Sequence, residues 1–463
     1  MTTINAAHRM DRLPISRFHK TMLFAVAFAY FFEFADINTF AVTSPKLLKV
    51  WDITVPQVAY VNSTSFAGMF LGAMVGGGIA DRLGRRSALV ITTIWFSAFS
   101  LLTAVSWNIW SLGIFRVLTS AGLSAMTVVA VIYVSEMFPA AKRGRYQAYA
   151  MVIGICGTPA TSLLASYVVP LTDWSWRLIY LWGGLGIVLL FMLHHLKESP
   201  QWLESNGRLD EAEALLQKIE NQVRSEGHAL PDAAPPAELA TQGPKVSWRV
   251  LLRRRNLYPT LLLSVLWITQ TIGFFGYSSW APTLLAKQGF SVEKSILYVA
   301  LTTVGAPLGC FLASLITDKF ERKWSLAVFG VIIGVSGLLY GLTFNPVLIV
   351  VFGFTVNFFE RGYTSLAYAY SPELFDTDAR SLGTSFSYGI GRLSNAAGPL
   401  IIAAIYTSSG YESVFMFIAG TWILGAIVLA IFGPRTRKRI KEELSVGPEE
   451  PAVTTTDPAR RPA

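Results

Sequence analysis

Long apolar stretches alternate with short polar ones along almost the whole chain. Each stretch is about twenty residues long, which is the length that an α-helix needs to cross the hydrocarbon core of a bilayer. Backbone polar groups cannot reach water there, so such stretches must form helices. The pattern predicts an all-α membrane protein with twelve transmembrane helices, at about residues 21–43, 59–80, 87–106, 108–135, 146–169, 176–195, 257–284, 294–317, 324–343, 346–371, 382–406 and 412–433.

The composition agrees with this interpretation. Of the 463 residues, 52% are apolar and only 14% are charged, whereas about a quarter of the residues of a soluble domain are charged. The net charge of +9 could suggest a nucleic-acid-binding protein. The Lys and Arg residues, however, stand in short connections between the apolar stretches, where they determine membrane topology. We therefore expect a lipid bilayer, and no nucleic acid, as the surroundings of this chain.

The connections differ in charge in a way that predicts the orientation. The segments DRLGRR (81–86), AAKRGR (140–145), DKFERK (318–323) and RTRKR (435–439) are basic, while SWN (106–108) and FNP (344–346) carry no charge. Basic connections stay on the cytoplasmic side. Both termini should therefore be cytoplasmic. The first apolar stretch lacks a small-residue cleavage site after it, so we expect a retained helix and not a signal peptide.

One long polar segment divides the twelve helices into two groups of six. The predicted organisation is a cytoplasmic N-terminus (1–20), a first six-helix bundle (21–195), a cytoplasmic linker (196–256), a second six-helix bundle (257–433) and a cytoplasmic, disordered tail (434–463). Within the linker, Ser199 and Pro200 suit the start of a helix. Apolar residues then recur at helical spacing between charges, which predicts an amphipathic helix; they are Leu209, Ala212, Leu215, Leu216, Ile219 and Val223.

The two groups are repeats of each other. Four residues of the first group recur at one constant separation in the second: Gly68, Asp81, Glu136 and Gly154 correspond to Gly305, Asp318, Glu373 and Gly391. Parallel repeats of this kind place a binding site between the halves, near the middle of the membrane.

Three motifs carry a resemblance to a known family. DRLGRR (81–86) with its echo DKFERK (318–323), KESPQWL (197–203) and PELFDTDAR (372–380) resemble the signatures of the major facilitator superfamily, in the branch of sugar porters and organic-ion transporters. The resemblance covers about residues 20–435. It implies two pseudo-symmetric six-helix halves, secondary active transport by alternating access and a cytoplasmic gate of salt bridges. The gate residues would be Asp81, Arg85, Arg86, Glu136, Arg143, Asp318, Arg322, Glu373 and Arg380. The alternative is that these charges only determine topology.

Charged residues inside the apolar stretches are the strongest indication of function. A charge at the bilayer centre costs about 2.5–3.5 kcal/mol on insertion scales, so it must be paired, protonated or exposed to water. Glu33 and Asp36 lie on one face of the first helix. Asp36 and Arg116 lie at similar depths, and they resemble the Asp–Arg pair that couples protons to transport in sugar porters. We expect Asp36, Arg116 and Glu33 to couple protons; a purely structural salt bridge is the alternative.

Arg392 stands near the middle of the eleventh helix and can hold a carboxylate bidentately. An Arg stands at the matching place in animal organic-anion transporters. The expected substrate site contains Arg392 with Gln270, Trp267, Phe274, Tyr277, Asn357, Glu360, Tyr388 and Glu33. Gln270 and Gly273 match the sugar porters' Gln-Gln-x-x-Gly-x-Asn pattern, but Thr269 and Phe275 depart from it. Aromatic side chains therefore replace sugar-binding ones. The alternative is an ion pair of Arg392 with Glu360 or Glu33.

These features predict a proton-coupled transporter for a small aromatic anion such as nicotinate, most similar to bacterial niacin permeases. The short connection between the first two helices favours a bacterial inner-membrane protein, and we expect a monomer. Organic cations, other aromatic acids or sugars remain alternative solutes, and a non-transporting sensor is an alternative function. No phosphate loop or nucleophile motif indicates an enzyme. Cys156 and Cys310 are single and far apart, so we expect no disulfide, metal or cofactor.

Overall fold

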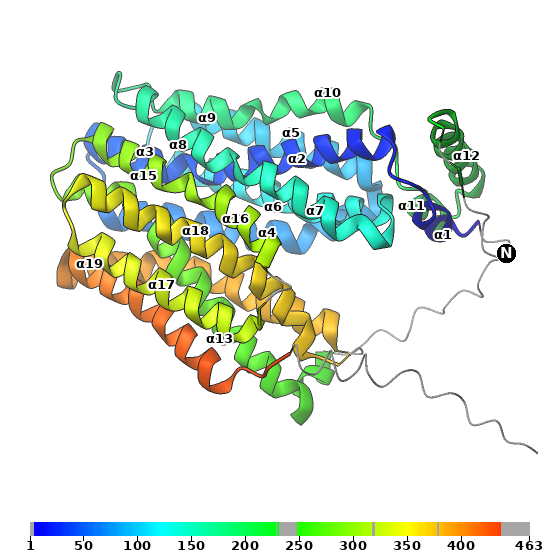
Figure 1. Cartoon of the computed structure of the whole chain (residues 1–463). Coiled ribbons are helices and arrows are strands. Elements are labelled where there is room, and N and C mark those ends of the chain that lie inside the picture. Colours follow the sequence, from blue (N-terminus) through cyan, green and yellow to red (C-terminus); the bar gives the residue numbers. More distant parts are fainter. Residues whose placement is uncertain (1–3, 228, 231–247, 317–319, 377–378, 437–463) are drawn as a thin grey trace, which may run out of the picture.

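The computed structural model describes residues 4–227, 229–230, 248–316, 320–376 and 379–436, and every regular element in these ranges is a helix. Ten helices are long and apolar enough to cross a membrane: Arg17–Val50, Val55–Leu83, Arg85–Ala104, Ile109–Met137, Ala140–Val168, Arg177–His194, Arg254–Ser278, Val292–Ala313, Arg322–Leu342 and Leu382–Phe432. They lie in two groups, one above the other in Figure 1. We call these groups the N-half and the C-half.

The N-half contains six membrane-crossing rods. Two of them change direction slightly at one residue, so the first consists of α2 and α3 and the fifth of α7 and α8. The elements are α2 (Arg17–Ile37), α3 (Thr39–Val50), α4 (Val55–Leu83), α5 (Arg85–Ala104), α6 (Ile109–Met137), α7 (Ala140–Ile155), α8 (Gly157–Val168), α9 (Arg177–Gly184), η1 (Leu185–Val188) and α10 (Leu189–His194).

The C-half also contains six rods, although its last helix is continuous in the chain. Its elements are α13 (Arg254–Ser278), α14 (Ala281–Lys287), α15 (Val292–Thr303), α16 (Gly305–Ile316), α17 (Arg322–Leu342), α18 (Pro346–Tyr370), η3 (Ser371–Leu374) and α19 (Arg380–Phe432). A straight helix as long as α19 would measure about 80 Å. Gly410, with φ 82° and ψ −173°, interrupts it. The two parts of α19 cross the membrane separately. Together with α18, which is not among the ten helices above, this gives twelve crossings.

Glycines that recur between the halves mark equivalent close contacts of helices. A methyl group added at Gly68 would lie 2.5 Å from the Val117 carbonyl oxygen, and one added at Gly305 would lie 2.6 Å from that of Phe354. Gly68 thus packs α4 against α6 as Gly305 packs α16 against α18. Small residues at such contacts let helices approach closely in a membrane, so the repeat in the sequence reflects a repeat in packing.

Three short helices lie at one end of the N-half (Figure 1): α1 (Ala6–Asp11), α11 (Pro200–Ser205) and α12 (Leu209–Ser225). The predicted stripe of α12 faces the protein, with Ala212, Leu216, Ile219 and Val223 buried.

Ion pairs attach α1 to α12. Arg9 and Arg12 contact Glu220 at 2.9 and 2.7 Å. Burial alone would raise the pKa of Glu220, but the hydrogen bonds from these two guanidinium groups outweigh it, so its pKa lies below the usual range. The carboxylate is therefore ionised at neutral pH and holds the N-terminal segment in place.

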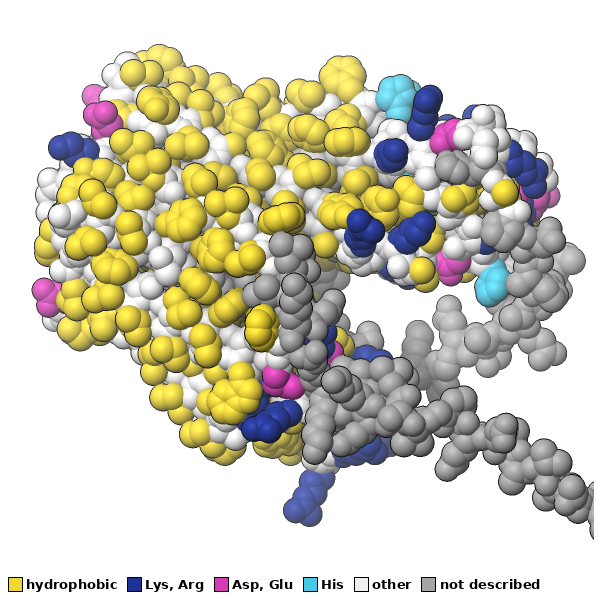
Figure 2. Space-filling model, viewed as in Figure 1, with side chains coloured by type: hydrophobic (Ala, Val, Ile, Leu, Met, Phe, Trp, Pro, Cys, Tyr) yellow, Lys and Arg dark blue, Asp and Glu magenta, His cyan; other side chains and the backbone are white. Residues whose placement is uncertain are grey.

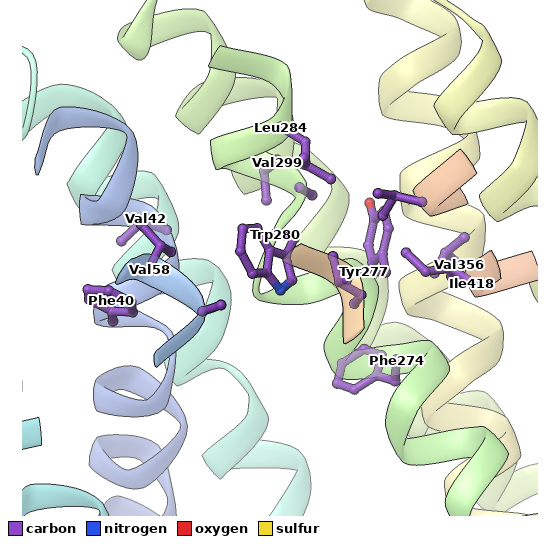
Figure 3. Packing of buried hydrophobic residues seen from close by; sticks show 14 of the residues in the cluster. Phe40, Val42, Val58, Phe274, Tyr277, Trp280, Leu284, Val299, Val356 and Ile418 are labelled. Atoms are coloured by element: carbon purple, nitrogen blue, oxygen red, sulfur yellow. The ribbon is translucent and has the colours of Figure 1, made fainter. Parts of the chain in front are cut away.

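The halves meet at the end opposite α12. Phe40, Val42 and Val58 of the N-half belong to the same apolar cluster as Trp280 and Leu284 of the C-half (Figure 3). We call this the closed end.

Polar and aromatic contacts add to this closure. The Ser44 and Thr283 hydroxyl oxygens lie 2.6 Å apart, and the Phe66 and Phe275 rings pack edge to face at 5.0 Å. At the end that carries α11 and α12, Figure 2 shows an opening between the halves. We call this the open end.

Figure 2 also shows the surface that faces the bilayer. Hydrophobic side chains cover the flank of both halves, and the charged side chains gather at the two ends. Large apolar residues are accordingly exposed on many helices, for example Leu71 on α4, Ile114 on α6 and Phe311 on α16. An apolar belt of this extent suits lipid and not water.

Candidate functional site

A buried ion pair joins the first and fourth rods of the N-half. Arg116 Nη1 on α6 lies 2.7 Å from Asp36 Oδ1 on α2, and both residues are almost fully buried. The Thr39 hydroxyl also donates to Asp36, and the Arg116 guanidinium lies 5.9 Å from the centre of the Tyr180 ring. The two residues predicted at equal depth are thus in contact. Removing one partner of such a pair typically costs about 3–5 kcal/mol.

A pocket lined by both halves adjoins this ion pair. Arg116, Asn62 and Ser120 line it from the N-half, and Phe275 and Ser278 line it from the C-half. The Arg116 Nε and Asn62 Nδ2 atoms have no hydrogen-bond partner among the described residues. The ion pair therefore lies at the interface between the halves and keeps an unused donor there.

Arg392 lies on α19 within a wall of aromatic rings. Its Nε donates to the Tyr388 hydroxyl at 2.7 Å. The Trp267 ring on α13 packs against Tyr388 at 4.9 Å and against Tyr368 of α18 at 5.0 Å. Tyr368 is 45% exposed. The three rings therefore form an aromatic cluster beside a guanidinium group, which suits an aromatic carboxylate.

Arg392 has no ion pair within 4 Å among the described residues, so the alternative pairings with Glu33 or Glu360 are not formed in this conformation. Glu33 on α2 is buried, with Thr127 and, across the interface between the halves, Arg392 as its polar neighbours. An acid of the N-half thus interacts electrostatically with a base of the C-half.

Glu360 is held within the C-half. Its Oε1 accepts hydrogen bonds from Gln270 Nε2 at 2.9 Å and from the Thr364 hydroxyl at 2.8 Å. Arg361 Nε lies 3.3 Å from its Oε2. The Arg361 guanidinium lies 4.8 Å from the centre of the Phe274 ring. Gln270, Glu360 and Phe274, all predicted in the site, are therefore neighbours.

Two residues predicted in the site lie elsewhere. Tyr277 is buried in the apolar cluster of the closed end (Figure 3) and packs edge to face on Tyr340 at 5.0 Å. Asn357 Nδ2 donates to the Gly353 carbonyl at 2.9 Å and to Thr302 at 3.3 Å. In this conformation the Tyr277 ring and the Asn357 amide both have their contact partners within the C-half. Tyr368, by contrast, was not among the predicted site residues.

The charged motif residues form contacts within each half. In the N-half, Arg85 contacts Glu136 at 2.7 Å and Asp81 at 3.2 Å. Arg143 lies 3.5 Å from Asp11, and the Arg86 guanidinium donates to the His194 carbonyl.

In the C-half, Arg322 contacts Glu373, Arg380 is exposed, and Asp318 lies outside the described residues. Among the described gate residues, no ion pair joins the two halves. This agrees with the opening at that end.

Glu198, in the KESPQWL segment, is a further residue of the open end. Its Oε1 accepts from the backbone amides of Arg85 and Arg86 at 2.7 and 3.1 Å. These amides form the first turn of α5, where the helix dipole favours a negative charge. The KESPQWL motif indicated the family but not this contact, which depends on the placement of α11.

Comparison with known proteins now identifies the family. The sequence model described as Major Facilitator Superfamily matches residues 26–358 and 297–462. The chain belongs to the major facilitator superfamily. A putative metabolite transport protein of Bacillus subtilis is 44% identical over 94% of this chain and 96% of its own. A niacin transporter of Acinetobacter baylyi is 30% identical over 95% and 99%.

A solved structure agrees with the fold. The xylose transporter of E. coli, in a partially occluded inward-open conformation, superposes with a TM-score of 0.72 over 91% of this chain and 99% of its own, at 16% identity. The predicted all-α, twelve-helix major facilitator fold is confirmed. The chain is a multispanning membrane transporter and not an enzyme.

Proposed function

We propose that this transporter takes up a small aromatic monocarboxylate, such as nicotinate, together with protons. The observation that carries the proposal is the Arg392 guanidinium, which has no acidic partner within 4 Å among the described residues and contacts Tyr388. The Trp267 and Tyr368 rings in turn pack against the Tyr388 ring. A carboxylate would bind the guanidinium, and its ring would pack on the wall. The niacin transporter among the relatives supports this solute class.

The same geometry supports proton coupling. A carboxylate on Arg392 would replace Glu33 as the negative charge facing this guanidinium, so Glu33 would then favour its protonated form. Asp36 would act as a second proton carrier. Arg116 would neutralise it while the ion pair is intact, and a proton would neutralise it when the helices move apart. The site suits an organic cation less well, because the carboxylates of Asp36 and Glu360 already have partners.

The orientation and the cycle follow from the basic connections. With the open end in the cytoplasm, the structure would be the inward-facing state of an inner-membrane protein with both termini inside. Alternating access would open the apolar cluster around Trp280 and close the open end, where Asp81, Arg85 and Arg380 would then form contacts between the halves.

The deciding experiment is uptake into proteoliposomes with the outside made acidic. We expect radiolabelled nicotinate to accumulate, a protonophore to abolish accumulation, and benzoate to compete while nicotinamide, xylose and an organic cation do not. Accumulation of a cation or a sugar in place of nicotinate would refute the proposed solute. Binding of nicotinate without accumulation would instead indicate a sensor.

Alternating access can be tested at the closed end. Because the Ser44 and Thr283 hydroxyls lie 2.6 Å apart, a Ser44→Cys/Thr283→Cys variant, with Cys156 and Cys310 replaced by serine, should form a disulfide across the halves. Oxidation is expected to lower nicotinate uptake at least tenfold, and a reductant should restore it. The two single-cysteine variants are the controls. Undiminished uptake by the fully cross-linked protein would contradict movement at this end.

A further inference from the structure

Arg361 on α18 is unlike the other two arginines inside the membrane region. Arg116 donates hydrogen bonds to Asp36, and Arg392 donates one to Tyr388. The Arg361 guanidinium donates none among the described residues, and its Nε is a buried donor without a partner. A guanidinium carries five N–H donors, and leaving the buried Nε donor unsatisfied is costly. Its retention here indicates a partner that binds during function.

The surroundings hold this guanidinium in place without using its donors. It lies 4.8 Å from the centre of the Phe274 ring of the C-half and 5.6 Å from that of Phe34 on α2 of the N-half. Both contacts are cation–π interactions, which use the face of the cation and leave its N–H edge free. Because one ring belongs to each half, the guanidinium lies between the halves. The side chain is 17% exposed, so the group remains accessible.

The neighbouring acid does not take up these donors. Glu360 is adjacent in the chain, and its Oε2 lies 3.3 Å from Arg361 Nε, yet neither atom has a hydrogen-bond partner. Its Oε1 is occupied by Gln270 and Thr364. The acid offsets the charge of Arg361 at close range but leaves its hydrogen-bonding capacity for another acceptor.

Arg361 and Arg392 share Tyr368 as a neighbour. The Tyr368 side chain, which is 45% exposed, interacts electrostatically with both guanidinium groups. It also packs against Tyr388, which binds Arg392. Tyr368 is therefore an electrostatic neighbour of two cations that belong to the same half.

We infer that Arg361 is a second anchor for the carboxylate of the transported solute, acting with Arg392. The inference rests on the proposed function, because it requires an anionic solute. The free N–H edge of Arg361 donates to the carboxylate, and the Phe34 and Phe274 rings flank the solute ring. Two guanidinium groups on α18 and α19 would thus hold one carboxylate from the C-half.

The test compares Arg361→Gln and Arg361→Lys with the unchanged chain in proteoliposomes, using nicotinate as the probe. A hydrogen bond to a charged group contributes enough for a change of about ten- to one-hundredfold. Arg361→Gln should therefore raise KM for nicotinate by about that factor and leave the maximal rate within about threefold. Arg361→Lys should recover part of the affinity, because it keeps the charge but loses the planar donor edge.

Lys46→Gln provides the matched control. Lys46 on α3 pairs with Asp173 at 2.9 Å, so the variant also removes one positive charge, but at the closed end, and its KM should equal that of the unchanged chain. Size-exclusion chromatography reports whether each variant is folded. If Arg361→Gln does not fold, the Arg361→Lys variant tests the role of Arg361 by itself, because that substitution is also expected to raise KM several-fold.

The outcomes separate this inference from the proposed function. An Arg361→Gln variant with unchanged KM, or with only a lowered maximal rate, would overturn the role of Arg361, while nicotinate uptake by the unchanged chain would still support the proposed function. If the unchanged chain transports no aromatic carboxylate, both fall together. A rise in KM with partial recovery by lysine supports the second anchor.

Discussion

Replacement of Arg392 by alanine is expected to abolish uptake of aromatic carboxylates, lowering the initial rate for nicotinate at least a hundredfold. The change removes the guanidinium that contacts Tyr388, against which the Trp267 and Tyr368 rings pack. A bidentate, charge-assisted contact with a carboxylate cannot be replaced by water without a large loss of affinity. Initial rates in proteoliposomes at a fixed pH gradient measure the effect.

The variant should still fold, because Arg392 is only partly buried and its one hydrogen bond goes to Tyr388. Tyr388→Phe is the matched control: it removes this hydrogen bond, keeps the ring and should slow uptake only several-fold. Normal uptake by a folded Arg392→Ala protein would remove Arg392 from the site and would leave the aromatic wall without a ligand to explain it.

The fold could be predicted because its main determinants are local in the sequence. The apolar stretches fix the number of helices, and the recurring Gly68 and Gly305 mark equivalent helix contacts. Even the interruption of α19 was expected, since the predicted crossings end at 406 and resume at 412, on either side of Gly410.

The pairing of Asp36 with Arg116 could be anticipated from their similar depth together with the resemblance to the Asp–Arg pair of sugar porters. Depth follows from the rise of a helix per residue, and a buried charge needs a partner at its own level. The rotation of helices was harder to predict. Along α13 and α18 the apolar residues cover every face, so no stripe shows which side meets the other half.

This explains the differences at the site. Tyr277 and Asn357 seemed suitable for a ligand, but they lie inside the C-half. Tyr368 and Phe34 were not among the predicted site residues, yet Tyr368 packs against Tyr388, which binds Arg392, and Phe34 contacts the face of the Arg361 guanidinium. Which end is open was also beyond sequence patterns, because two conformations of one chain differ by only a few kcal/mol.

Asp36→Asn is expected to eliminate proton-driven accumulation of nicotinate while leaving exchange of labelled for unlabelled nicotinate largely intact. Asparagine has the same shape, and its carbonyl oxygen can still accept from Arg116 Nη1, which lies 2.7 Å from Asp36 Oδ1. It cannot bind and release a proton. Exchange needs only solute binding and movement of the halves, whereas accumulation also needs a group whose charge changes during the cycle.

Two controls make this result specific. Asp173→Asn removes an exposed carboxylate at the closed end and should leave both assays unchanged. Glu33→Gln tests the other proton carrier and should weaken accumulation through its interaction with Arg392. Concentration of nicotinate by Asp36→Asn in a pH gradient would show that Asp36 is not required for coupling, and Glu33 would then remain as the acid that faces the solute site. Loss of exchange as well would mean that an uncompensated Arg116 blocks the movement, which places the ion pair in the conformational change and not in proton transfer.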